Sequence, residues 1–229
     1  MTQRSILAGK NQAIIIKAGA SVTVKGYDSD MVIAETKTWG VTLERRSESQ
    51  IGRARAAIGE HVLFDWRIKV PNLGEQKFEN EVMEVQFGGS GEVLVPFDSN
   101  LKVYAGMNID VQGVQGQVDA YSGLDLSLQN VYRLGNASAG RVMNINCQTM
   151  LESDVTIGAG SDLRFHVADL TSARLRVKDI GGYWEARIGG GEKTVYLRSG
   201  GDVTLVTDQK VEPLPPNYVL GRIEKPATG

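Results

Sequence analysis

The sequence predicts an all-β protein, and three observations carry that prediction. The 229 residues include 24 Val and 14 Ile against 18 Leu, and β-branched side chains favour extended backbone. Glycine accounts for 27 of the 229 residues, or about 12%, whereas its usual share is about 7%. Four of its six prolines lie in the last 17 residues, so the backbone before them keeps the N–H donors that paired strands need.

The second half of the chain consists of short segments in which apolar and polar residues alternate, as in a strand with one buried face. Such segments occupy 101–103, 109–111, 118–120 and 124–128. The later ones centre on residues 9 to 11 positions apart, namely Val155, Phe165, Leu175, Ala186, Val195 and Leu205. This spacing fits a strand and a turn of about five residues each.

The first half contains strand candidates at less even intervals. They lie at 14–16, 22–24, 31–33, 41–43, 63–68, 82–87 and 93–95. Residues 47–60 are expected to form either a helix, which Gly52 and Gly59 weaken, or a protruding loop with one helical turn. A second irregular insert is expected at 131–141, and the proline-rich end from about Asp208 is not expected to continue a strand ladder.

Two arrangements fit these strands. Hairpins in succession would give a β-sandwich or a barrel. A coiling chain would give a β-solenoid with two or three strands per rung and about 20–30 residues per repeat. The chain lacks the Asn-Gly and Asp-Gly dipeptides that tight hairpins prefer. We therefore predict a single-stranded β-solenoid (β-helix), with the β-sandwich as the alternative. A less regular N-terminal β cap with the first rungs spans 1–99, the regular solenoid spans 100–208, and a Pro-rich tail spans 209–229.

The segment from Glu92 to about Thr207 resembles the bacterial "putative adhesin" family of β-solenoid domains. The similarity lies in the repeated strands of the form x-Leu/Val-x-Val, in the closing 200–205 sequence Gly-Gly-Asp-Val-Thr-Leu, and in residues 22–30. The resemblance implies a β-solenoid fold and a role in adhesion.

Composition excludes several classes of function. The 25 Lys+Arg and 27 Asp+Glu give a net charge of −2, which disfavours a nucleic-acid partner. One cysteine and two histidines leave no disulfide framework or cysteine-based zinc site. No apolar run is long enough to cross a membrane, and no glycine-rich segment has the context of a phosphate loop. We expect no cofactor, no metal and no membrane insertion.

The start of the chain shows no apolar secretion signal. A cytoplasmic location is therefore expected, or an extracellular or cell-surface one if the sequence is a mature form.

The candidate interaction residues are charged side chains at outward strand positions. Asp110, Asp119 and Asp125 are expected to form a solvated acidic face, although stacked carboxylates would also suit a glycosidase pair or a calcium site. The later outward charges are basic, and pairs 22 or 23 residues apart are expected on one face, one rung apart. These residues are Arg164, Arg176, Arg187 and Arg198. Such a face suits a polyanion, and Tyr196 is a candidate platform for a sugar ring.

Other reactive or aromatic residues are assigned to packing by their alternation. Trp184 and Cys147 are expected in the core and His166 on the solvated side, while Trp39 and Trp66 are expected in the core or the cap.

These features favour a non-catalytic, adhesin-like interaction protein that self-associates into an oligomer or filament. The separated acidic and basic charges would set the register between copies, and the tail would cover the last rung. A carbohydrate-binding cell-surface module is the alternative, and a polysaccharide-active enzyme is disfavoured.

Overall fold

The structure is a computed structural model that describes residues 2–9, 11–37, 40–47, 81–150, 154–170, 172–190, 193–215 and 222–226. Within these residues all regular secondary structure is β, in one sheet of 20 strands, which confirms the all-β prediction. The strands are β1 (Thr2–Leu7), β2 (Ala13–Ala18), β3 (Val22–Tyr27), β4 (Met31–Thr36), β5 (Val41–Ser47), β6 (Glu81–Phe87), β7 (Gly91–Pro96), β8 (Asn100–Ala105), β9 (Ile109–Gln112), β10 (Gln117–Ser122), β11 (Leu126–Ala139), β12 (Met143–Met150), β13 (Val155–Ala159), β14 (Leu163–Val167), β15 (Ala173–Asp179), β16 (Gly182–Ile188), β17 (Lys193–Ser199), β18 (Val203–Val206), β19 (Glu212–Pro213) and β20 (Arg222–Glu224).

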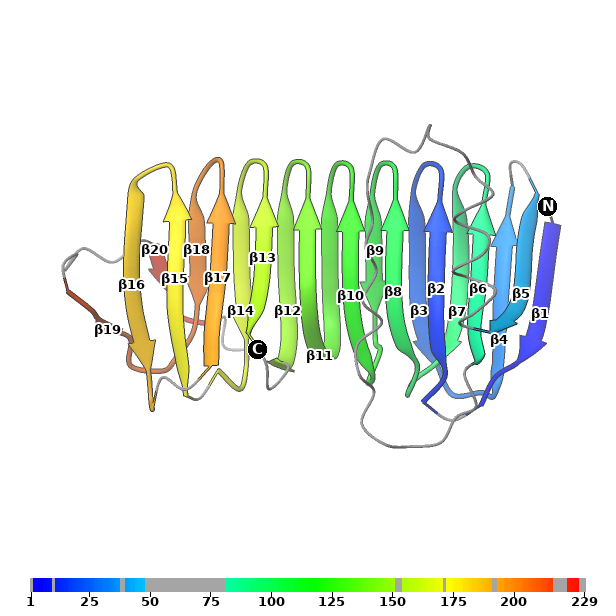
Figure 1. Cartoon of the computed structure of the whole chain (residues 1–229), viewed down its shortest axis with the longest axis horizontal. Coiled ribbons are helices and arrows are strands. Elements are labelled where there is room, and N and C mark those ends of the chain that lie inside the picture. The colour runs from blue at the N-terminus through cyan, green and yellow to red at the C-terminus, as the bar shows by residue number, and fades with distance from the viewer. Residues whose placement is uncertain are drawn as a thin grey trace.

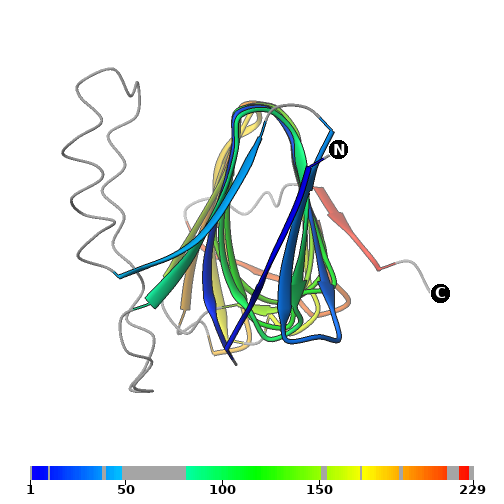
Figure 2. The same ribbon diagram turned by 90° about the vertical axis from the view of Figure 1, so that its right-hand side faces the viewer.

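The sheet folds into two long layers that meet along one edge (Figures 1 and 2). The first layer runs β5-β6-β2-β8-β10-β11-β13-β17-β15-β16-β19, and the second runs β1-β4-β7-β3-β9-β11-β12-β14-β18-β20. Strand β11 contributes to both layers. It turns the corner at Asn130, whose φ of 53° is left-handed and is tolerated by asparagine.

Two consecutive strands, one in each layer, make a unit that we call a rung. In the middle of the molecule successive rungs pair in parallel and repeat every 17 residues, since Ile109, Leu126 and Met143 lie in register. The next residue in that column is Leu163, 20 residues further on. The repeat is thus at or below the lower end of the expected range, because only three residues separate the two strands at the shared edge.

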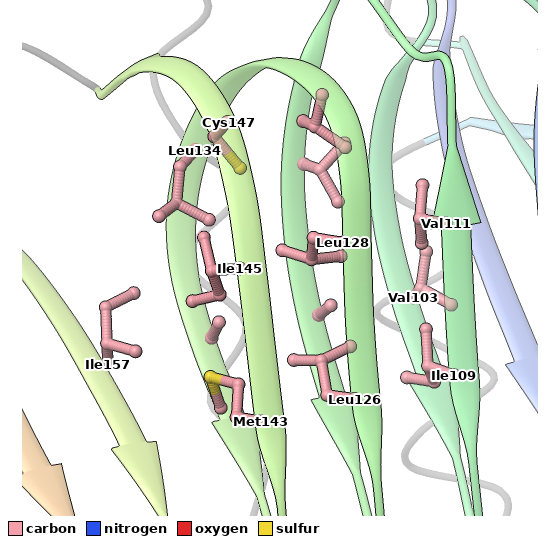
Figure 3. Close-up of a cluster of buried hydrophobic side chains, with 14 of the residues drawn as sticks. Val103, Ile109, Val111, Leu126, Leu128, Leu134, Met143, Ile145, Cys147 and Ile157 are labelled. Carbon is pink, nitrogen blue, oxygen red and sulfur yellow. The ribbon is translucent and has the colours of Figure 1, made fainter. Parts of the chain in front are cut away.

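A single apolar core fills the space between the layers (Figure 3). Inward side chains from successive rungs stack above one another, as Val111, Leu128 and Ile145 do. Burial of each such side chain contributes roughly 1.5–3 kcal/mol. Cys147 and Trp184 belong to this core with 2% and 4% exposure, as predicted from alternation.

A column of glycines forms the turns at the edge where the layers meet. A Cβ at Gly123 would lie 2.1 Å from the carbonyl oxygen of Gly106, and one at Gly140 would lie 2.0 Å from that of Gly123. Real side chains never approach so closely, so adjacent turns can stack at the spacing of the strands only if these positions lack Cβ atoms. The same close approach recurs along the column at Gly19, Gly160 and Gly200.

The two ends of the molecule depart from sequential stacking. Near the N-terminus the rung β2/β3 lies between β6/β7 and β8/β9. Near the C-terminus β17/β18 lies beyond β13/β14, and β15 lies outside β17. Antiparallel strands finish the N-terminal end (β1, β4 and β5) and the first layer at the C-terminal end (β16 with β19), whereas the parallel strand β20 finishes the second layer there.

Three sequence-based expectations are corrected here. Residues 131–139 continue strand β11 instead of forming an irregular insert, with Gly135 set against the carboxylate of Asp119. Strands β15 and β16 form a hairpin, whose two-residue turn is closed by a hydrogen bond from the Gly181 N–H to Asp179 Oδ1 (2.9 Å). The tail does extend the ladder, through β20 beside β18.

Two of the apolar tail residues that are expected to cover the last rung lie within the described residues. Leu214 N–H donates to the Glu185 carbonyl, whereas Ile223 is 37% exposed. Tyr218, Val219 and Leu220 lie outside the described residues, as do residues 48–80, Trp39 and Trp66.

Candidate binding surfaces

The eight predicted interaction residues do not gather in one place. Five lie on the first layer, namely Asp119, Arg176, Arg187, Tyr196 and Arg198. Asp110 and Arg164 lie on the second layer, and Asp125 lies in the turn before β11.

The arginine pairs expected from 22- and 23-residue spacing do not form. Arg176 is in register with Tyr196, and Arg198 is in register with Lys178. Arg164 is flanked by Asn144 and Thr204 on the layer opposite Arg187. The expectation failed because β15 and β16 form a hairpin, which disrupts the count of residues per rung.

The acidic residues do not form a solvated face. Asp119 is only 5% exposed and accepts a hydrogen bond from the Asn136 N–H (2.7 Å), and burial raises the pKa of its carboxyl group. Asp125 accepts a hydrogen bond from Arg141 Nε (2.8 Å), and Arg141 lowers the pKa of that carboxyl group. Asp110 accepts from Gln112 Nε2 (2.6 Å). The described residues contain no cluster of three or more metal-ligating side chains.

Arg176 and Tyr196 form a contact pair on the first layer. The Arg176 guanidinium carbon lies 5.6 Å from the Tyr196 ring centroid, and Nη1 donates to the Tyr196 hydroxyl (3.2 Å). Arg176 also forms an ion pair with Glu185 (3.3 Å), which binds Arg174 as well (2.6 Å). The hydrogen bonds from Tyr183 and Arg174 lower the pKa of Glu185.

A straight row of outward residues runs beside this pair, one residue from each neighbouring strand. We call it the tyrosine–arginine strip, and it consists of Tyr104, Tyr121, Ser138, Gly158, Arg198 and Lys178. The two tyrosine rings stack with centroids 5.2 Å apart and planes 13° apart. Ser138, Arg198 and Lys178 are exposed, and a Cβ at Gly158 would meet nothing within 4 Å. The strip is therefore aromatic at one end, shallow in the middle and basic at the other end.

The second layer carries an open groove, which we call the polar groove. Its polar lining consists of Gln129, Asn130, Asn144, Asn146, Arg164 and His166, and its apolar lining consists of Leu128, Ile145, Val206 and Pro226. Asn144 and Asn146 point outward between the core residues Met143, Ile145 and Cys147. His166 is half-buried in this groove rather than freely solvated.

Hydrogen-bonding capacity remains unused in the polar groove. Within the described part of the chain, the side chains of Asn144, Asn146 and His166 make no hydrogen bond, whereas Gln129 donates to Ser127 (3.2 Å). Arg164 donates to Glu224 of the tail (2.7 Å), which fixes the tail along one side of the groove. The sequence analysis missed the two asparagines because it followed charges, although the alternation over residues 143–147 places both on the outer face.

Comparisons with known proteins add one distant neighbour. No protein family and no curated protein matches the chain. A solved structure described as a putative cell adhesion protein from Clostridium sporogenes matches over 98% of this chain and 99% of that chain, with 10% identity and a TM-score of 0.36. The described residues contain no helix that is long and apolar enough to cross a membrane.

Proposed function

We propose that this chain is a non-catalytic, adhesin-like interaction protein that binds carbohydrate in the polar groove. The proposed scaffold is a β-solenoid with two strands per rung. The parallel register of successive rungs at 17-residue intervals supports a solenoid over a β-sandwich, since sandwiches are built from antiparallel hairpins.

The unused side chains of Asn144, Asn146 and His166 are the observation that carries this proposal. Each amide offers two donors and an acceptor, and a neutral imidazole offers one of each, which matches the several hydroxyl groups of a sugar. Asn146 and His166 occupy adjacent strands in register, about 4.8 Å apart. Pro226, which is half-buried, gives the groove an apolar side against which the C–H face of a sugar ring can pack.

The groove residues also support the non-catalytic part of the proposal. Glycosidases use two carboxyl groups about 5–9.5 Å apart, and none of the described residues lining the groove is acidic. Asp119 lies on the other layer, so it is not available to pair with Asp110 or Asp125 across the groove.

A glycan array followed by calorimetry on the best neutral ligand tests the proposal. The double variant Asn144→Ala/Asn146→Ala is expected to weaken binding at least tenfold, because two hydrogen-bonding side chains are lost. Gln86→Ala is the matched control, since it removes an exposed amide from the other layer. Equal binding by wild type and the double variant, or no neutral glycan bound by wild type, would contradict the proposal.

Self-association of the chain stays a prediction, and fewer of the predicted charged side chains are available for contacts between copies. Asp119 is buried, and Asp125, Arg164 and Arg176 are engaged within the chain. Of the predicted basic residues, Arg187 and Arg198 are exposed and make no ion pair within the described part of the chain, whereas the exposed Arg164 pairs with Glu224. Light scattering of wild type and an Arg187→Glu/Arg198→Glu variant at low salt tests it, and a wild-type monomer at high concentration would rule it out.

A further inference from the structure

We propose that the carbohydrate bound by this chain is an extended, uncharged polysaccharide that lies across the strands of the second layer, from β14 to β9. This inference rests on the proposed carbohydrate binding in the polar groove and specifies the form of the ligand. It also extends the site beyond the groove, to Asp110 and Gln112 on β9.

Two lines of polar side chains cross the outer face of the second layer. Strands β9, β11, β12 and β14 are neighbours in register, and buried residues such as Val111 and Ile145 alternate with the outward ones. We call the two lines the polar rows. The first consists of Asp110, Ser127, Asn144 and Arg164, and the second consists of Gln112, Gln129, Asn146 and His166.

The spacing of the polar rows suits a chain of sugar rings. Neighbouring strands lie about 4.8 Å apart, and residues two positions apart on one strand are about 6.6 Å apart. A linear β-1,4-linked chain advances by nearly one strand spacing per sugar, and the hydroxyl groups along its two edges can reach one row each. Each sugar therefore meets one strand, and the strands that carry the rows correspond to about four sugars.

The small twist of this part of the layer keeps the rows straight. Strands in ordinary sheets are rotated by about 20–25° relative to their neighbours, which would turn such a row along its length. The strands from β8 to β14 stand nearly parallel in Figure 1 and overlap closely when viewed from the end in Figure 2. A linear polymer can therefore contact successive strands without bending.

Hydrogen-bonding groups remain for a ligand outside the asparagines of the groove. Gln112 Nε2 donates to Asp110 Oδ2 (2.6 Å), and Gln129 Nε2 donates to Ser127 Oγ (3.2 Å). Within the described part of the chain the two glutamine side chains make no other hydrogen bond, so each keeps its carbonyl oxygen and one amide hydrogen for a sugar hydroxyl. Gln129 is exposed and Gln112 is half-buried.

The polar rows have defined ends. Beyond β14 the next residues in register are Thr204 and Val206, which are only 9% and 3% exposed. Beyond β9 the second row reaches Lys25, which forms an ion pair with Glu92 (2.8 Å). A ligand that uses uncharged hydrogen-bonding groups is thus confined to the strands between these ends.

The charges in the rows favour an uncharged glycan. Asp110 is the one carboxylate in the rows, and Arg164 already pairs with Glu224 (2.7 Å). The other members are amides, a serine and a histidine, which exchange hydrogen bonds with hydroxyl groups. The rows therefore offer no surplus of positive charge to an acidic polysaccharide.

Calorimetry with β-1,4-linked oligosaccharides of glucose, xylose and mannose, from two to six units long, tests the inference. In the series that binds, affinity is expected to rise at least tenfold from two to four units, because further hydrogen bonds form along the rows. From four to six units it is expected to rise less than twofold, because the rows end at β9 and β14.

A variant outside the groove tests the extension of the site to β9. Gln112→Ala is expected to weaken binding of the four-unit sugar at least threefold and to leave binding of the two-unit sugar within twofold, because the shorter sugar occupies the groove alone. Gln86→Ala, which removes an exposed amide from the other layer, is the matched control and is expected to change neither affinity.

Nuclear magnetic resonance supplies a readout of position. The side-chain amide signals of Gln112 are expected to shift with the four-unit sugar and not with the two-unit sugar, whereas those of Asn146 are expected to shift with both.

The inference and the proposed function fail in different ways. Equal affinity for two and four units, or equal effects of Gln112→Ala and Gln86→Ala, would overturn the inference and leave carbohydrate binding in the groove intact. The same holds if a neutral glycan binds on the array but none of the three linear series binds. If wild type binds no neutral glycan at all, both the inference and the proposed function are wrong.

Discussion

In the middle of the molecule, from β8 to β14, each rung stacks on the rung that precedes it in the sequence, with glycines at the shared edge. At both ends, a rung from elsewhere in the sequence is inserted between parallel strands, and antiparallel strands lie further out, namely β4 and β5 at the N-terminal end and β16 at the C-terminal end (Figure 1). The N-terminal rung β2/β3 pairs with strands from residues 81–112, and β17/β18 separates β13/β14 from β15 and β20.

This difference shows how a stack of identical rungs is brought to an end. Repeated parallel rungs leave an open strand edge that invites pairing with other chains. Each inserted rung pairs with strands that are distant in the sequence. The antiparallel strands that lie further out do not present the edge of another regular rung. The middle therefore depends on exact repetition of turns and core residues, whereas the ends depend on long-range contacts.

The largest expected effect comes from a side chain in the stacked turns. Gly123→Val places a branched side chain against the Gly106 carbonyl, only 2.1 Å from the position of its Cβ, and the turn has to shift. We expect a loss of stability of about 3 kcal/mol or more, or failure to fold. Urea unfolding measures it, with Gly158→Ala as the control that meets open space. Equal midpoints for the two variants would contradict the role of the glycine column.

The second test creates a cavity of similar size in each of the two regions by a Leu→Ala substitution. Leu128 in the middle and Leu205 in the inserted rung β18 are both fully buried, so Leu→Ala is expected to cost about 2–5 kcal/mol at either site. Hydrogen exchange is expected to show weakened protection across the middle for Leu128→Ala, but mainly beyond β14 for Leu205→Ala. Identical protection maps would mean that the ends and the middle unfold as one unit.

Deletion of residues 209–229 is expected to have a smaller effect. It removes β19 and β20, which pair over two and three residues, together with the Arg164–Glu224 ion pair. We expect the melting temperature to fall by several degrees and the protection of β18 to decrease, since its outer edge is uncovered. An unchanged melting temperature and oligomeric state would show that the tail does not cap this end.

The smallest expected effect is electrostatic and lies at Asp119, where the register between β10 and β11 shifts. Burial raises the pKa of its carboxyl group above the ordinary value of 3.8, so the folded state binds a proton more tightly than the unfolded state does. As the pH rises above 3.8, the carboxyl group ionises more readily in the unfolded state, and the folded protein loses stability. Asp119→Asn keeps an acceptor for the Asn136 N–H and removes this cost.

The melting temperature of the Asp119→Asn variant relative to wild type is therefore expected to rise from pH 4 to pH 7. A difference that is constant over this range would contradict the burial of a charged carboxylate. Asp119→Ala is the companion variant, and it is expected to lower stability at every pH because the Asn136 N–H loses its partner.

Alternation of side chains was sufficient to place many strands and to separate inward from outward residues. Cys147, Trp184 and the core residues of β12 to β18 all lie where their position in the pattern predicts. The glycines at 106, 123 and 140 also carry the 17-residue repeat in the sequence itself, whereas the ten-residue interval between strands reports only the length of a strand and its turn. These features are local, because the side-chain direction and the turn conformation depend on a few neighbouring residues.

The identity of each strand's neighbours was decided only in the folded chain. Backbone hydrogen bonds join any two strands, so the residues of β2 do not indicate that β6 and β8 will flank them. The same holds for the surfaces: Arg176 meets Tyr196 and Arg198 meets Lys178 through lateral register. Asp119 is buried against Asn136 because the register between β10 and β11 shifts by one residue there. Outward position follows from the alternation within one strand, but the partners and solvent exposure of a side chain follow from the strands beside it.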